Sequence, residues 1–259
     1  MTGSTKKRDP HGGADPYSKL SHAQERRKMT YPLVIVGTVV VVAICALVAF
    51  LVTRSDDDSS STAASGTGAA AAADAKQQTA DVTVSGEPLP QMPETSGSAF
   101  TDAASDTAIG RSAPKIEGES FDGSKISIDP ADGTPRVFVF VAHWCPHCQA
   151  EVPLIQEWID AGNLPDNVEI VFVSTAVTPA RGNYPVSDWI VKEGVTPKVI
   201  LDDDSSGAAS KFGLTGFPYF VMTNGEGKVV ARGSGEVPIE TFGAAVDALA
   251  AGQDPNTAS

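Results

Sequence analysis

The distribution of apolar and polar positions divides the 259-residue chain into parts with different expected structures. Residues 1–30 are polar, basic and rich in Gly, Ser and Pro, which predicts a disordered tail. Residues 31–54 contain a long apolar run and predict a transmembrane helix. Residues 55–108 hold few apolar side chains and predict a disordered linker rich in Ala, Ser, Gly and Asp. Residues 109–251 show periodic apolar patterns and predict one folded domain, before a short C-terminal tail at 252–259.

Within the predicted domain, short β-branched and aromatic runs alternate with helical patterns. The turn residues 121–124, followed by alternating Ile126 and Ile128, predict a hairpin at the entrance of the fold. A strand, a helix and a second strand then succeed one another, which indicates a βαβ unit, a parallel sheet core and an α/β fold. The predicted strands are 136–141, 168–174, 198–201, 219–223 and 228–232, and the predicted helices are 146–160, 187–193, 206–212 and 238–251.

The apolar run from Leu33 to Val52 has no charged residue. As a helix it spans about 30 Å, the thickness of the hydrocarbon core of a bilayer. Arg26, Arg27 and Lys28 precede it, and an excess of Lys and Arg marks the cytoplasmic side. We therefore expect a single-pass signal-anchor in the cell membrane, with the N-terminus cytoplasmic and the C-terminal domain extracytoplasmic. A cleaved signal peptide is the alternative, but its apolar core is shorter, about 7–15 residues, and ends at a small-residue site that is missing here.

Composition narrows the chemistry. The net charge of −13 at pH 7 argues against nucleic-acid binding, which needs a basic face. The chain has three cysteines, too few for a disulfide scaffold. Cys45 lies within the apolar run, where we expect a small apolar side chain in the membrane. Cys145 and Cys148 are therefore the pair available for chemistry.

The sequence Cys145-Pro146-His147-Cys148 lies where a predicted strand turns into a predicted helix. Two cysteines at this spacing favour a redox motif, because their sulfurs are close enough to form a disulfide. The helix N-terminus stabilises a thiolate at Cys145, and Cys148, one turn further, resolves the mixed disulfide formed with a substrate. Pro146 suits the first helical turn. A positive charge on His147 would lower the pKa of Cys145 and make the disulfide more oxidising.

Other uses of the motif need residues that are missing here. Covalent c-type haem requires a histidine after the second cysteine, and that position is Gln149. A zinc or copper site built from the two cysteines with His143 and His147 stays open as an alternative, although no further Cys or His follows in the chain. Peroxidases of the peroxiredoxin family carry a Thr three residues before their cysteine. This chain has Ala142 at that position and does not resemble them there. We therefore expect no metal and no cofactor.

Several short stretches occur in a familiar order along the domain: Ala113-Pro114, Phe121-Asp122-Gly123, Trp144-Cys145-Pro146-His147-Cys148, Glu151-Val152-Pro153, Gly213-Leu214-Thr215-Gly216-Phe217-Pro218 and Gly225-Glu226-Gly227-Lys228. In these stretches the domain resembles the thioredoxin superfamily and, within it, the membrane-anchored, extracytoplasmic TlpA-like thiol–disulfide oxidoreductases. The resemblance implies a thioredoxin-like fold, with a mixed central sheet flanked by helices. It does not extend to the predicted tail, membrane segment and linker.

The resemblance also implies a substrate surface beside the redox pair. It implies that Pro218 is a cis-proline facing the CxxC motif, which a proline directly before a strand permits. The exposed backbone of Phe217 would then pair with an extended substrate peptide. Trp144, which directly precedes the first cysteine, is the third residue of this predicted substrate-binding surface.

The resemblance also bears on which residue accepts a proton from Cys148 and on the direction of electron transfer. Glu151 matches a helix carboxylate of TlpA-like reductases and is predicted to exchange a proton with Cys148. Many thioredoxins carry a buried acid six residues before the first cysteine, and here that residue is Val139. The Pro146-His147 pair resembles that of the strongly oxidising DsbA-like oxidases. The resemblance to the TlpA-like group thus favours a reductase, whereas the presence of His147 favours an oxidase.

Two functional hypotheses follow. The first is a membrane-tethered extracytoplasmic thiol–disulfide oxidoreductase that exchanges disulfides through Cys145 and Cys148. Its partners would be protein thiols and disulfides outside the cytoplasm and a redox partner in the membrane, without nucleic acid. The sequence does not fix the oligomeric state, although a monomer is favoured. The second is a thioredoxin-fold metal carrier or redox sensor without turnover.

Overall fold

The computed structural model describes residues 76–93 and 100–257. The predicted cytoplasmic tail, the predicted transmembrane helix and about half of the predicted linker lie outside these residues. In the described part of the chain, no helix is both long enough and apolar enough to cross a membrane. The membrane anchor therefore stays a prediction.

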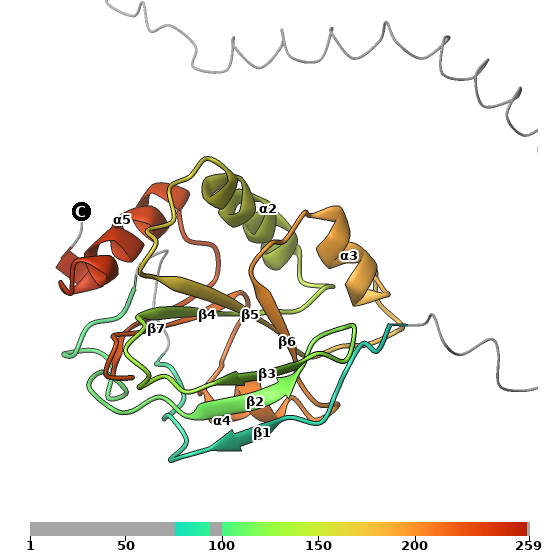
Figure 1. Ribbon diagram of the computed structural model, residues 1–259, viewed down its shortest axis with the longest axis horizontal. Coiled ribbons are helices and arrows are strands. Elements are labelled where there is room, and N and C mark those ends of the chain that lie inside the picture. The colour runs from blue at the N-terminus through green and yellow to red at the C-terminus, as the bar shows by residue number, and fades with distance from the viewer. Residues whose placement is uncertain (1–75, 94–99, 258–259) are drawn as a thin grey trace, which may run out of the picture. The chain divides into compact units, whose positions relative to one another are not determined.

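A five-stranded mixed sheet forms the centre of the domain, in the order β6-β5-β4-β7-β8 (Figure 1). The central strand β4 (Arg136–Val141) pairs in parallel with β5 (Glu169–Ser174) and antiparallel with β7 (Tyr219–Thr223). The strands β6 (Lys198–Leu201) and β8 (Val229–Ser234) form the two edges. This arrangement confirms the predicted α/β architecture with a mixed sheet.

The central strand β4 explains why the sheet has two apolar faces. All six of its residues are buried. Val137, Val139 and Val141 pack into one hydrophobic cluster, and Phe138 and Phe140 pack into a second one. Because successive side chains of a strand point to opposite faces, a strand covered on both faces is apolar at every position. The unbroken apolar run in the sequence is the signature of this position.

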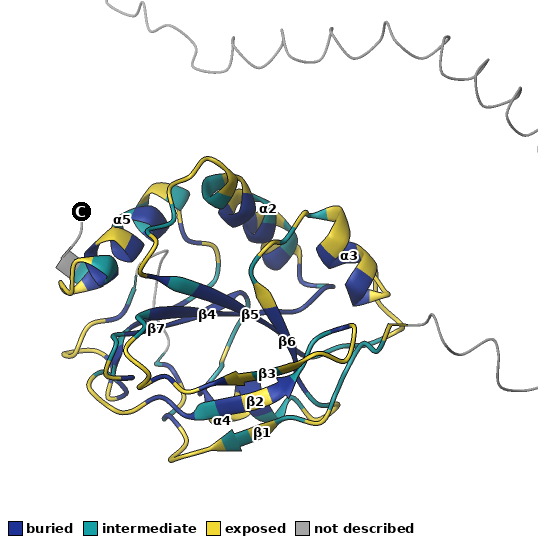
Figure 2. Ribbon diagram, viewed as in Figure 1, coloured by how far each residue is buried: buried dark blue, intermediate teal, exposed yellow. Residues whose placement is uncertain are grey.

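Helices cover one face of the sheet, and a helix with a small sheet covers the other (Figure 1). The helices α2 (Pro146–Asp160), α3 (Val186–Lys192) and α5 (Ile239–Ala250) supply the cluster that contains the valines of β4. The short helix α4 (Gly207–Lys211) lies on the opposite face with the phenylalanines. Figure 2 shows that the helices turn their buried sides toward the sheet and their exposed sides away from it.

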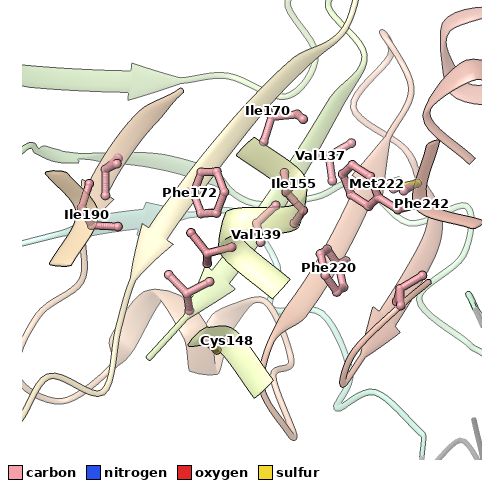
Figure 3. Close-up of a cluster of buried hydrophobic side chains, with 14 of the residues drawn as sticks. Val137, Val139, Cys148, Ile155, Ile170, Phe172, Ile190, Phe220, Met222 and Phe242 are labelled. Atoms are coloured by element: carbon pink, nitrogen blue, oxygen red, sulfur yellow. The ribbon is translucent and has the colours of Figure 1, made fainter. Parts of the chain in front are cut away.

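The helix α2 has the bounds that the sequence predicts. It follows β4 directly and packs its buried side on the sheet, where Figure 3 shows Cys148 and Ile155 in the cluster with Val139 and Phe220. A spacing of three and four residues places side chains on one side of a helix. The buried positions of α2 have this spacing and are Cys148, Glu151, Val152, Ile155 and Gln156.

A three-stranded antiparallel sheet packs beside α4, in the order β1-β2-β3. Its strands β2 (Lys115–Glu119) and β3 (Lys125–Ile128) form the hairpin that the sequence predicts. Its strand β1 (Thr83–Ser85) pairs with β2 and belongs to the segment predicted as a linker.

The linker prediction is wrong for residues 76–93 and 100–108, which are packed on the domain. Leu89 and Met92 are 4% and 3% exposed and belong to the second hydrophobic cluster. The backbone N–H of Met92 donates to Gly213 O at 2.9 Å. Local composition gave no sign of this packing, because Leu89 and Met92 bind backbone carbonyls of Lys211 and Gly213, more than one hundred positions away.

One buried arginine holds both of these segments. Arg232 of β8 is fully buried, and its Nε and Nη2 donate to the two carboxylate oxygens of Asp106 at 2.7 and 2.5 Å. Its Nη1 donates to Pro90 O at 2.8 Å and to the Tyr219 hydroxyl at 3.0 Å. Burial raises the pKa of Asp106, but the hydrogen bonds from Arg232, the Ala108 N–H and Thr101, together with the charge of Arg232, hold that pKa below its usual value. The guanidinium thus fastens residues 76–93 and 100–108 to the main sheet.

The predicted C-terminal tail is also partly structured. After α5 the chain forms a 3₁₀ turn, η2 (Pro255–Thr257), in which Pro255 is buried. The Asn256 amide donates to Val230 O at 3.4 Å. Residues 255–257 of the predicted tail therefore contact β8.

We predict that Asp106→Ala lowers the free energy of unfolding by about 3–5 kcal/mol. The substitution leaves the buried guanidinium of Arg232 without a counter-charge, and an uncompensated buried charge is far costlier than a lost surface contact. Urea denaturation of the full chain, followed by circular dichroism, measures the change.

The matched control is Lys115→Ala, which breaks the solvent-exposed Lys115–Glu117 pair, 2.9 Å long. Exposed pairs contribute about 1 kcal/mol or less. Equal losses in the two variants would contradict the role given to Asp106.

Candidate active site

The redox motif lies at the turn from β4 to α2. Cys145 is the N-cap of α2, with an extended backbone (φ −77°, ψ 121°), and Pro146 occupies the first helical turn as predicted. No side chain caps the N-terminus of this helix. Cys145 therefore lies next to the free N–H groups and the positive end of the helix dipole.

Cys145 faces the loop that contains the predicted cis-proline. The Phe217–Pro218 peptide bond is cis, which confirms the prediction. The Cys145 thiol donates to Phe217 O over 4.0 Å, and the cysteine is 6% exposed. An extended peptide that pairs with the backbone of Phe217 would thus place its own sulfur next to Cys145.

Cys148 lies one helical turn further, on the buried side of α2. It is fully buried, and both cysteines are free thiols in this structure. Burial raises the pKa of the Cys148 thiol, and the neighbouring Cys145 and Glu151 act in the same direction. Cys148 therefore needs a proton acceptor close by before it can act as a thiolate.

Glu151 is the acid that the structure places behind this cysteine. It is 2% exposed, its Oε2 accepts a hydrogen bond from Val237 N at 3.3 Å, and its Oε1 has no hydrogen-bond partner. Burial, with a smaller contribution from the charge of Glu236, raises the pKa of Glu151 to about 7 against the lowering effect of the Val237 N–H. A carboxyl group with this pKa both takes and returns a proton at neutral pH.

His147 is exposed and has an unexpected partner. Its side chain is 63% exposed, and its Nδ1 lies 2.5 Å from Oε1 of Glu236. That the imidazole tunes Cys145 stays a prediction, because the contact that the structure gives it is with a carboxylate. Glu236 was not identified from the sequence, since 89 positions separate it from His147 and it belongs to no motif.

Trp144 lies beside the loop of the cis-proline. Its Nε1 donates to Ala176 O at 2.8 Å, and its ring meets the edge of the Phe217 ring at 6.0 Å between centroids. The guanidinium of Arg181 lies over the Trp144 ring, 5.3 Å from its centroid. Trp144 and the Phe217–Pro218 peptide thus lie beside Cys145, and Arg181, which the sequence did not reveal, lies over Trp144.

His143 holds the next loop in place. It is 1% exposed, its Nδ1 lies 2.7 Å from Gly182 O, and its Nε2 lies 3.2 Å from Thr178 N. The carbonyl requires a proton on Nδ1 and the N–H requires a lone pair on Nε2, so this arrangement fits a neutral ring. His143 therefore anchors the loop that carries Arg181.

Comparison with known proteins relates this chain to one protein family and to one curated relative. Residues 109–232 match the AhpC/TSA family, and this range includes both cysteines, Glu151 and Pro218. The protein named sporulation thiol-disulfide oxidoreductase A, from Bacillus subtilis (strain 168), is 30% identical to this chain over 112 residues. The aligned part is 43% of this chain and 65% of that relative, slightly less than two thirds of its length.

The described domain is also similar to solved structures. A hypothetical protein from Sinorhizobium meliloti 1021 matches with a TM-score of 0.50 at 17% identity, over 57% of this chain and 87% of that chain. StoA from Bacillus subtilis matches with a TM-score of 0.43 at 23% identity, over 52% and 96% of the two chains. At 17% identity the first likeness concerns the fold alone. With the matched family and the sheet order, it confirms a thioredoxin-like fold for the described domain.

We predict that Glu151→Gln removes a pH dependence of stability from the reduced chain. Below about pH 4.5 the folded and unfolded states both hold the proton, whereas between 4.5 and about 7 only the folded state holds it. The free energy of unfolding of the native chain therefore falls as pH rises through this window, by on the order of 3 kcal/mol. Denaturation series at pH 4.5 and pH 8 measure the loss, which the variant should lack.

Glu157→Gln is the control, because Glu157 is an exposed acid on the same helix. It should keep the pH profile of the native chain. A Glu151→Gln profile with the same slope as that of the native chain would show that Glu151 is not buried as a protonated acid.

Proposed function

We propose, on the premise that residues 109–232 form a redoxin domain of the AhpC/TSA family, that this chain is a membrane-tethered, extracytoplasmic thiol–disulfide oxidoreductase. One observation carries the proposal. The Cys145 sulfur lies at a helix N-terminus, 4.0 Å from the carbonyl oxygen of Phe217 beside the cis-proline, with the buried Cys148 one turn behind it. This geometry suits a nucleophilic thiolate that receives a peptide and a second thiol that releases it.

In the first step, the Cys145 thiolate attacks one sulfur of a substrate disulfide. A bond forms between Cys145 and that sulfur, the substrate S–S bond breaks, and the second substrate sulfur leaves as a thiolate. The backbone of Phe217 pairs with the substrate chain and holds the attacked sulfur in line. The product is a mixed disulfide between the chain and its substrate.

In the second step, Glu151 accepts the proton of Cys148. The resulting thiolate attacks the Cys145 sulfur, the mixed disulfide breaks, and the substrate sulfur that was bonded to Cys145 leaves as a thiolate that takes up a proton. The substrate has gained two electrons, and the chain now holds the Cys145–Cys148 disulfide. Run in reverse, the same steps oxidise a substrate dithiol.

The reduction potential decides which direction prevails. Equilibration of the full chain with glutathione measures it. A value near about −270 mV makes the chain a reductase and one near about −120 mV makes it an oxidase.

The proposed location rests on residues outside the described part of the chain. The run from Leu33 to Val52 is long enough to span a bilayer, and Arg26, Arg27 and Lys28 precede it. An extracytoplasmic domain would meet protein disulfides, which persist in oxidising compartments. Continued turnover would then need a redox partner in the membrane to renew the state of the cysteine pair.

We predict that Cys148→Ser traps a covalent complex between the full chain and a disulfide-containing model peptide. Cys145 still attacks, but Cys148 is no longer present behind it to resolve the mixed disulfide. Non-reducing electrophoresis and mass spectrometry detect an adduct that dithiothreitol reverses.

The matched control is Cys145→Ser, which should form no adduct at the motif, because Cys148 is buried and its raised pKa keeps it protonated. Adducts of equal yield in both variants would contradict the assigned roles. If neither variant forms an adduct and the reduced native chain binds Zn²⁺ or Cu⁺ at one equivalent, the metal-carrier hypothesis takes the place of this one.

We predict that protease added outside intact cells removes the C-terminal domain of the full chain and leaves an N-terminal tag protected. The double substitution Val42→Arg and Ala43→Arg puts two charges at the centre of the run, each costing about 2.5–3.5 kcal/mol for insertion. This variant should leave the membrane fraction, whereas the conservative pair Val42→Leu and Ala43→Leu should stay in it. A native chain found in the soluble fraction would remove the membrane part of the proposal.

A further inference from the structure

A single dipeptide, Glu236-Val237, contacts both ionisable neighbours of the cysteine pair. It lies in the loop between β8 and α5. The Glu236 side chain is 51% exposed and reaches outward to His147, with 2.5 Å between Oε1 and Nδ1. Val237 is 2% exposed and points inward, where its N–H donates to Glu151 at 3.3 Å. The exposed and the buried partner of the redox pair are thus joined through two adjacent residues.

The outward contact bears on Cys145. His147 lies between the two cysteines, and an imidazolium there would stabilise a thiolate at Cys145 and so favour the reduced form. A carboxylate within hydrogen-bond distance balances that positive charge, so the charge that the thiolate experiences is smaller. Glu236 therefore opposes the oxidising tendency that the Pro146-His147 pair would otherwise confer.

The inward contact bears on Cys148. The negative charge of Glu236 adds to burial in raising the pKa of Glu151, while the adjacent Val237 N–H fixes the orientation of that carboxyl group. Glu151 thus remains able to hold the proton that Cys148 gives up. A rearrangement of the loop that moved Glu236 would also move Val237, so the two contacts depend on the same backbone.

We propose that Glu236 is a positioning residue of the redox pair, which limits the oxidising strength of the Cys145–Cys148 disulfide through its contact with His147. The inference deepens the proposed function and rests on it. It also assigns a role to a loop that no motif marks.

The test is the equilibrium of the full-length chain with glutathione, measured for Glu236→Gln. The amide keeps the size and hydrogen-bonding capacity of the side chain but removes its charge. We expect the equilibrium constant to move about three- to tenfold toward the reduced chain and oxidised glutathione, and a tenfold change corresponds to about 30 mV. An unchanged constant, or one that moves toward the disulfide form, overturns the proposal.

A double-mutant cycle separates action through His147 from a general effect of charge. In a His147→Asn background, Glu236→Gln should change the logarithm of the equilibrium constant by less than half as much as in the native background. Equal changes in the two backgrounds overturn the proposed route through His147.

Glu240→Gln is the control, because Glu240 is an exposed acid in the first turn of α5 and loses the same charge four residues away. It should leave the equilibrium constant within twofold of the native value, and an equal shift in this variant overturns the proposal. Because the glutathione equilibrium needs no protein substrate, it stays measurable even where Cys148→Ser traps no peptide. Failure of this inference is therefore distinguishable from failure of the proposed function.

Discussion

The burial of β4 on both faces is the constraint from which the site follows. Its valines pack under α2 and α5 and its phenylalanines pack toward α4, so the strand cannot shift along its axis without exposing one set. The end of β4 is therefore fixed, and with it the start of α2 at Cys145. A thiol at that point lies next to the free N–H groups and the positive end of the helix dipole. The antiparallel neighbour β7 begins directly after the cis-proline, which faces this thiol.

Two buried carboxylates in this domain have pKa values shifted in opposite directions, because one has a charged partner and the other has none. Asp106 is matched by the guanidinium of Arg232 on both oxygens, and that fully satisfied pair secures the N-terminal segments. Glu151 has one N–H donor, an oxygen without a partner and a raised pKa. Such a group costs stability when it is ionised, and a proton-transfer role gives a reason for keeping it beside Cys148.

Local patterns in the sequence sufficed for the elements and for the core of the site. The apolar run of β4, the helical spacing of α2 and the CxxC motif are short-range features, and the structure places them as expected. The linker prediction was wrong because this segment is held by the contact between Asp106 and Arg232. These residues lie 126 positions apart, and local composition does not reveal such a contact. Glu236 was missed for the same reason, since only the folded chain brings it to His147.

On the proposal that Glu236 acts through His147, the direction of electron transfer depends on the fold as well as on the four-residue motif. The two central residues of a CxxC motif act through the charge that they place near the first cysteine, and that charge depends on what contacts them. Here the histidine that favours an oxidant meets a carboxylate from the loop before α5. Two chains with the same Cys-Pro-His-Cys sequence would therefore differ in potential if one lacked this acid, and the loop between the last strand and the last helix is the place to compare them.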